Sequence, residues 1–406
     1  MGQGTAFIGS MLTSVAVPVQ VYDLSHSSLQ VGLVGFVGLA PLVLFGLYGG
    51  AIADVMDRRL LYFVSSLGTW AMTLGLLAQA VLGVDNVPLI LLLVAVQSGF
   101  FAVSSSARGA IIPRIVEPDL VPAANTLTFT VSNVGQVLGP LIAGALVTRA
   151  HGFVYAYSCD AVLFTLALYA AVRLPRIPPD GHTQRAGLRS VVDGLAFIAK
   201  RPVLIMSFGV DIVAMVFAMP RALYPAVADD RWGGNVGPLY AAIAIGAVLV
   251  GLSSGWIGRV RRQGVTLTFA IVAWGLCVAF AGLAHSLWLA VLLLAVAGGA
   301  DLISAVYRQT ILQTYAPDEM RGRMQGVFVV VVAGGPRLGD VRAGATAAAT
   351  SVTFSWVGGG LACAAVVLVA ALLVRPFWRY DAQAELADVA EAVESSAAGG
   401  AIQSPG

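Results

Sequence analysis

Two aspartates stand inside strongly apolar stretches of the chain. Asp211 lies about 8 residues into the stretch 203–226, and Asp301 lies about 8 residues before the end of the stretch 286–309. If both stretches are helical, the two carboxyl groups lie roughly 12 Å from the same end of their helices. An apolar setting and a neighbouring carboxylate both favour the protonated form, so the pair suits proton pickup and release. A hydrogen-bonded structural role is the alternative.

The residue types that bind metals or attack substrates are sparse. The four histidines lie in or beside expected loops, and none stands at metal-ligand spacing from another. Cys159, Cys277 and Cys363 all lie inside apolar stretches, away from any ligand-like cluster. No set of nucleophile and base is recognisable. The sequence therefore predicts no metal site, no cofactor and no enzyme activity.

Polar, aromatic and sulfur-containing side chains on three stretches suit contact with a substrate. Gln20 and Gln97 are polar residues within the first and fourth apolar stretches, and Phe208 and Met215 share one helical face with Asp211. Methionine and aromatic surfaces adapt to varied apolar ligands. We therefore expect these side chains to line a substrate cavity, although helix packing is the alternative for Phe208 and Met215.

These residues belong to a chain that is too apolar for water. Apolar residues make up 58% and charged residues 11% of the 406 residues, with a mean hydropathy of +0.86. A soluble domain carries roughly 25% charged residues. We expect an all-α membrane protein, because spans of roughly 20 residues allow about twelve helices in this length. The expected helices are 4–22, 30–53, 60–83, 87–111, 121–148, 152–173, 203–226, 236–257, 265–284, 286–309, 324–348 and 351–374.

Lysine and arginine set the expected orientation. With both termini in the cytoplasm, 18 of the 23 basic residues fall in inner connections or in the tail, and Arg58, Arg108 and Arg308 are counted among them. The outer connections hold Arg149 and Arg231. Basic residues concentrate on the cytoplasmic side of membrane proteins. The sequence therefore predicts a multi-pass protein of the bacterial inner membrane with cytoplasmic termini.

The chain is expected to divide into four parts. These are six-helix halves at 1–173 and 203–374, a cytoplasmic linker at 174–202 and a disordered cytoplasmic tail at 375–406. In the linker, apolar residues recur at helical spacing between Leu188 and Ile198, which predicts an amphipathic helix lying on the inner membrane face.

The two halves repeat each other at a distance of about 200 residues. Arg108, Pro118, Gly139 and Gly144 are echoed by Arg308, Pro317, Gly335 and Gly344. Two halves in the same orientation imply a pseudo-twofold axis along the membrane normal. A substrate site is then expected between them, near the midplane.

A motif follows the second expected helix. Gly50-Ala-Ile-Ala-Asp54-Val-Met-Asp57-Arg58-Arg59 resembles the signature Gly-x-x-x-Asp-Arg-x-Gly-Arg-Arg of the major facilitator superfamily. The resemblance implies that Asp54 latches helix 2 to the inner end of helix 11, and that Arg58 joins a charge relay that stabilises the outward-facing state. A carboxylate is attracted to a helix N-terminus, as such a latch requires. Asp57 and Val55 depart from the signature, so one salt-bridge partner is missing.

A glycine and proline motif lies in the fifth expected helix. The spacing of Gly135 and Gly139 lets another helix approach closely, and Pro140 permits a bend. With Gly144, these residues resemble the Gly-x-x-x-Gly-Pro-x-x-Gly-Gly motif of major facilitator exporters, with Ala143 in place of one glycine. Ordinary helix packing explains the glycines equally well.

Further segments carry a closer resemblance. They are Val15–Gln20, His26–Gly32, Leu223–Asp229, Leu239–Ile243 and Leu312–Arg323. They are similar to the bacterial enterobactin-exporter branch of the superfamily, which implies export of a siderophore or a drug driven by protons. The same branch houses macrolide and multidrug exporters, so the substrate stays open.

Further charges also fall within the expected helices. Asp160 is expected to be structural, because helix 6 is peripheral in the superfamily. Asp340, Arg337 and Arg342 lie near the outer end of helix 11, where we expect a local ion cluster.

We therefore expect a secondary active exporter that exchanges a small molecule for protons across the lipid bilayer by alternating access. An importer of the same fold is the first alternative, because coupling sets direction. A non-transporting membrane sensor or scaffold is the second, although the embedded Asp211 and Asp301 argue against a scaffold. The net charge of +2 predicts no nucleic-acid partner. A monomer is compatible with the sequence, which sets no oligomeric state.

Overall fold

Polar caps, glycine and proline set where the apolar stretches begin and end as helices. The computed structural model describes residues 2–175, 177, 188–315, 318–378 and 380. Ser27, Asn86 and Ser351 each accept a hydrogen bond from a backbone N–H in the first turn of the helix that follows. Such caps satisfy N–H groups that have no partner within the helix. Gly83 ends a helix with a φ of 63°, a conformation that glycine adopts without strain.

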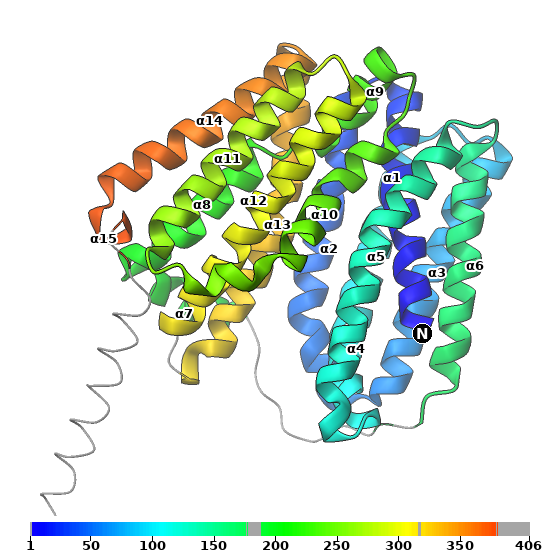
Figure 1. The fold of residues 1–406 in the computed structure, drawn as a ribbon. Coiled ribbons are helices and arrows are strands. Elements are labelled where there is room, and N and C mark those ends of the chain that lie inside the picture. Colours follow the sequence, from blue (N-terminus) through cyan, green and yellow to red (C-terminus); the bar gives the residue numbers. More distant parts are fainter. Residues whose placement is uncertain (1, 176, 178–187, 316–317, 379, 381–406) are drawn as a thin grey trace, which may run out of the picture.

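The elements of the described part of the chain are all helical, and most lie in two bundles (Figure 1). The first bundle contains α1 (Gly2–Ser25), α2 (Ser28–Val55), α3 (Arg58–Leu82), α4 (Val87–Ile115), the short η1 (Pro118–Leu120), α5 (Val121–Val147) and α6 (Gly152–Val172). The second contains α8 (Pro202–Phe217), η2 (Arg221–Leu223), α9 (Tyr224–Trp232), α10 (Gly237–Leu252), η3 (Ser254–Arg259), α11 (Gln263–Leu283), α12 (Leu287–Tyr315), α13 (Asp318–Ala349), α14 (Val352–Leu373) and α15 (Arg375–Trp378).

Most of these helices are suited to a membrane. Within the described residues, ten helical stretches are long and apolar enough to cross one, and α8 to α9 count together as one of them. The 16-residue α10 and the more charged α13 bring the number to the twelve expected helices. Large apolar side chains face outward, such as Leu252 at 84% exposure, Leu373 at 76% and Trp288 at 71%. Lipid chains can cover surfaces of this kind.

The seventh expected helix is broken, which the sequence analysis did not predict. It was expected as one helix over 203–226, whereas α8 ends at Phe217 and α9 begins only at Tyr224. Pro220 has no N–H to bond the carbonyl of Val216, so the regular pattern stops there. Arg342 of α13 supplies donors instead. Its Nε bonds the Val216 carbonyl at 3.0 Å, and its second guanidinium nitrogen bonds the Phe217 carbonyl.

The two bundles meet at one end of the molecule and diverge toward the other (Figure 1). At the closed end α5 packs on α10, α2 on α13 and α1 on α9. The backbones cross so closely at Gly144 and Gly237 that a Cβ on either would press on the other residue. Leu12, Val15 and Ala143 of the first bundle belong to the hydrophobic core of the second. The contact between the bundles is therefore an extension of that core.

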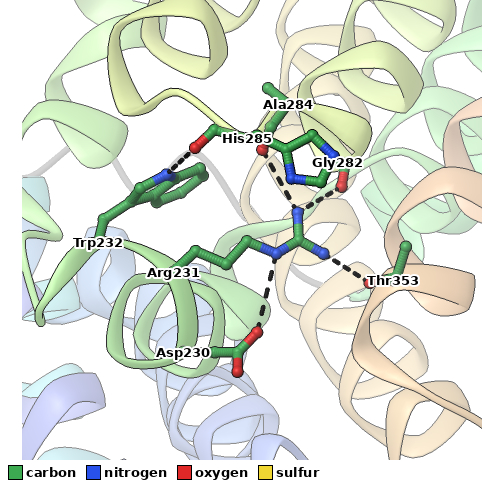
Figure 2. A network of polar contacts seen from close by, with 7 residues as sticks. All are labelled: Asp230, Arg231, Trp232, Gly282, Ala284, His285 and Thr353. Carbon is green, nitrogen blue, oxygen red and sulfur yellow. Dashed lines mark hydrogen bonds and ion pairs between the residues drawn. The ribbon is translucent and has the colours of Figure 1, made fainter.

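A polar network holds α9, the second piece of the broken helix, in place (Figure 2). Arg231 of α9 donates to the carbonyls of Gly282 at 2.9 Å and Ala284 at 3.4 Å, at the end of α11. It also donates to the Thr353 hydroxyl of α14 at 2.7 Å. The Trp232 indole donates to the His285 carbonyl at 3.0 Å. Because a cation at a helix C-terminus is stabilised by the helix dipole, Arg231 fastens α9 to its own bundle.

A separate helix lies in the expected linker. It is α7 (Leu188–Ala199), and it packs against α8 and α13. Val192 is 60% exposed and Leu195 50% exposed, whereas Ile198 is buried. Exposed apolar residues on this helix suit the expected position on a membrane face. The expected disordered tail lies, apart from its first residues, outside the described part of the chain.

Candidate functional site

A cavity of about 770 Å³ lies between the two bundles. This volume is within the range of small-molecule sites, which is roughly 300–1,000 Å³. The first bundle lines it with apolar side chains, with the charged Arg108 and Asp160, and with hydroxyl and amide groups, including those of Ser10, Ser14, Thr69, Thr73, Gln97 and Gln136. The second bundle contributes the charged side chains of Arg221, Asp301, Arg337 and Asp340 and the phenol of Tyr240. Both walls therefore carry charged side chains, and most of the hydroxyl and amide groups lie on the first.

Arg308 joins the two aspartates that the sequence singled out. Its guanidinium forms an ion pair with Asp211 of α8, and it lies 3.8 Å from a carboxylate oxygen of Asp301 on its own helix. The side chains of Arg308 and Asp211 are 5% and 3% exposed, whereas that of Asp301 is 44% exposed. Asp301 lines the cavity, and Asp211 lies behind it with Phe208 and Phe328.

The place of Arg308 corrects the sequence analysis, which counted it with the cytoplasmic connections. It lies two turns before the end of α12 and is buried. The sequence already indicated that Arg308 lies near Asp301, because it follows Asp301 by seven residues and therefore falls on the same helical face. The ion pair with Asp211 needs the packing of α8 on α12, which no local pattern reveals.

Gln97 reaches a buried carboxyl group through a hydroxyl. Its amide donates to the Thr73 hydroxyl at 3.0 Å, and Thr73 donates to Asp160 at 3.2 Å. Asp160 lines the cavity and is 1% exposed, although its helix was expected to be peripheral. Gln20 lies elsewhere. It exchanges hydrogen bonds with Gln79 and accepts one from Tyr157 at 2.7 Å, and it is not among the described residues that line the cavity.

Phe208 and Met215 lie behind the second wall of the cavity. The Phe208 ring meets the Phe328 ring edge to face, with 6.4 Å between the centroids. Met215 fills the space over Gly335 and Gly339 of α13. In this conformation both side chains pack between helices.

The expected ion cluster on α13 is split. Asp340 accepts a hydrogen bond from the backbone N–H of Ala222 at 3.3 Å, and Arg337 bonds the Ala333 carbonyl of its own helix. Arg221 of η2 lines the same part of the cavity. Arg342 does not join them, because its guanidinium faces the end of α8.

The glycines of the α5 motif have two different partners. Gly135 and Gly139 face Phe7, Ile8 and Met11 of α1, whereas Gly144 crosses Gly237 of α10. The motif therefore lies both within the first bundle and at the contact between the bundles.

The motif after α2 is described only in part. Arg59 donates to the Val172 carbonyl at the end of α6 at 2.6 Å, and the backbone N–H of Arg58 bonds the Ile177 carbonyl at 3.1 Å. Asp57 caps the start of α3, which explains an acidic residue at this position. Gly50 and Asp54 fall near the end of α2, with the Asp54 side chain outside the described residues, so the latch stays a prediction.

Solved structures with a similar architecture are transporters. The nucleoside transporter NupG aligns with a TM-score of 0.72 at 16% identity, covering 93% of this chain and 98% of that one. A bacterial homologue of the human lysosomal transporter Spinster, in an inward-facing and unoccupied conformation, aligns with a TM-score of 0.66 at 19% identity over 95% and 96% of the chains. At these identities the likeness shows the major facilitator fold of two six-helix halves.

Comparison of sequences also identifies the family. The enterobactin exporter EntS of Shigella boydii serotype 18 and that of Escherichia coli O81 are each 30% identical over 390 residues, covering 93% of this chain and 92% of the relative. The family described as transmembrane secretion effectors matches residues 3–396. Its members are transporters, not enzymes. The chain therefore belongs to the transmembrane secretion effector family of the major facilitator superfamily, as a multi-pass inner-membrane transporter of small molecules.

Proposed function

We propose that the protein exports a siderophore or drug-like molecule from the cell, in exchange for protons that enter. The single observation that carries the proposal is the half-exposed carboxyl group of Asp301 in the cavity wall, beside the buried Arg308. The similarity to enterobactin exporters favours export and makes enterobactin the first substrate to test.

The three charges have separate roles in this proposal. Arg308 and Asp211 form a neutral buried pair, so the guanidinium keeps a partner whether Asp301 is ionised or protonated. Asp301 is half exposed and can exchange a proton with water in the cavity. A carboxyl group that changes charge while its surroundings stay compensated avoids the cost of a lone buried charge.

The distribution of basic residues supports an orientation in which the open end faces the cytoplasm. Sixteen of the 23 basic residues fall in the connections and the tail expected at that end, once the cavity-lining Arg108 and the buried Arg308 are set aside. On this basis the conformation is inward-facing, and alternation closes the cytoplasmic end while the contact of α5 with α10 opens. The resemblance to the superfamily signature assigns the latch of that cytoplasmic closure to Asp54.

Transport into everted membrane vesicles tests the proposal. With an inside-acid proton gradient, vesicles that contain the protein should accumulate enterobactin. Asp301→Asn mimics the protonated form, so it should abolish uphill accumulation while downhill exchange of enterobactin survives.

Asp230→Asn is the matched control, because that carboxylate is 80% exposed outside the cavity, and it should accumulate enterobactin at the wild-type rate. If Asp301→Asn also pumps at that rate, the coupling site lies elsewhere. Uptake of enterobactin by intact cells that rises with expression would instead establish an importer.

A further inference from the structure

Among the described residues, the wall contributed by the first bundle contains one carboxyl group, that of Asp160 on α6. One carboxylate oxygen accepts hydrogen bonds from the Thr13 hydroxyl of α1 at 2.6 Å and the Thr73 hydroxyl of α3 at 3.2 Å. The other oxygen, Oδ1, is buried and has no hydrogen-bond partner among the described residues. A Cβ at Gly9 would collide with this oxygen, so the glycine leaves room for it.

No described cation compensates this carboxyl group at ion-pair distance. The helices packed against α6 are α1, α3 and α5. Their titratable side chains, with those of α6 itself, are Tyr22 and Asp23 on α1, Arg58, Arg59 and Tyr62 on α3, and Tyr155, Tyr157, Cys159 and Tyr169 on α6, whereas α5 has none. The charged ones on α1 and α3 lie ten or more residues from Thr13 and Thr73, which is roughly 15 Å along a helix.

Two states of Asp160 follow from this setting. Burying an ionised carboxylate without a cation is unfavourable, so the group carries a proton where water is excluded. Where the cavity admits water, the proton can leave, because Asp160 lies in the cavity wall and Thr73 links it to the amide of Gln97. Two hydroxyl donors on the other oxygen then stabilise the ionised form.

We propose that Asp160 is a second proton-binding group of the transport cycle, separate from Asp301 and placed in the opposite wall. The reaction is simple protonation: the carboxylate takes a proton from water in the cavity and returns it to water after the cavity has switched sides. The inference rests on the proposed proton coupling, but it assigns a site that this coupling does not require.

Infrared difference spectroscopy of the reconstituted full chain, stepped through pH, tests it without any substrate. The carbonyl stretch of a protonated carboxylic acid is the signal. The wild type should show a titrating band that disappears in Asp160→Asn and persists in Asp301→Asn. Thr13→Val retains the carboxyl group but removes a donor, so it should shift the frequency of the same band even if Asp160→Asn folds poorly. Ser66→Ala is the control on α3, because Ser66 contacts Ser104 and not Asp160, and it should leave the band unchanged.

Identical titrating bands in the wild type, Asp160→Asn and Thr13→Val would overturn the assignment. The outcome is separable from that of the proposed function. If the Asp301 band titrates and vesicles still pump enterobactin, only the role of Asp160 fails. If transport proves independent of protons, the proposed coupling fails, and a band that belongs to Asp160 then marks a titrating carboxyl group without a place in the transport cycle.

Discussion

Arg308 holds a positive charge inside the second bundle, and its two carboxylate neighbours differ in exposure. The close pair with Asp211 is almost completely buried, whereas Asp301 faces the cavity. Breaking a buried ion pair by removing one partner is strongly destabilising, because the remaining charge is uncompensated. Replacing both partners with neutral groups of similar size costs much less.

Arg308→Met should therefore lower the free energy of unfolding by about 3–5 kcal/mol. The double variant Asp211→Asn/Arg308→Met should recover most of this loss, since no lone charge remains. Thermal unfolding in detergent measures both, and Arg149→Met, at an exposed arginine, serves as the control. Equal destabilisation by the single and double variants would show that the loss in Arg308→Met does not come from an uncompensated Asp211.

The sequence revealed which residues were unusual but not how they pair. Asp211 and Asp301 stood out because charges are rare in apolar stretches. Their meeting through Arg308 depends on α8 packing on α12. Asp160 was expected to be structural because of its helix. Only the structure shows that it bonds Thr13 and Thr73 and lines the cavity.

At the scale of single helices, local patterns predicted most boundaries and missed the break in the seventh. Pro220 lies within the expected stretch 203–226, and proline is a common helix breaker. Proline is also tolerated inside α5, where Pro140 does not end the helix. What separates the two cases is Arg342, which completes the broken end of α8 from another helix. That contact is about 125 residues away in sequence.

The crossing of α5 and α10 gives a prediction for the closed end. Gly144→Ala places a methyl group against Gly237 and should push the two helices apart. Nitroxide labels at Asp85 and Asn235, in a background without the native cysteines, report the distance between the bundles there. Pulsed electron paramagnetic resonance should show a longer distance than in the parent protein.

Gly209→Ala is the matched control for that crossing. Gly209 also lies within a helix, but nothing lies within 4 Å of an added Cβ, so the label distance should not change. An unchanged distance in Gly144→Ala would mean that the crossing does not determine how closely the bundles approach.

At the scale of the whole molecule, composition and internal repetition are strong signals. The twelve expected helices and the two six-helix halves follow from hydropathy and from the repeat at about 200 residues. The conformation does not follow, because neither signal says at which end the two halves meet. Gly144, Gly237 and Gly344 are identifiable as small residues, but only the structure shows that Gly144 crosses Gly237 and that Gly344 packs on Ser28.

The short α10 makes the protein sensitive to the thickness of its bilayer. Sixteen residues span about 24 Å, whereas a typical hydrocarbon core is about 30 Å thick. The exposed Trp256 in η3 follows directly and suits the membrane–water boundary. Lipid must therefore thin beside α10, or α10 must shift along its contact with α5, and each adjustment costs free energy that grows with the mismatch.

In proteoliposomes made from phosphatidylcholines of increasing chain length, enterobactin exchange should slow in the thickest bilayers. An exchange rate that is independent of lipid chain length would show that the length of α10 does not limit transport.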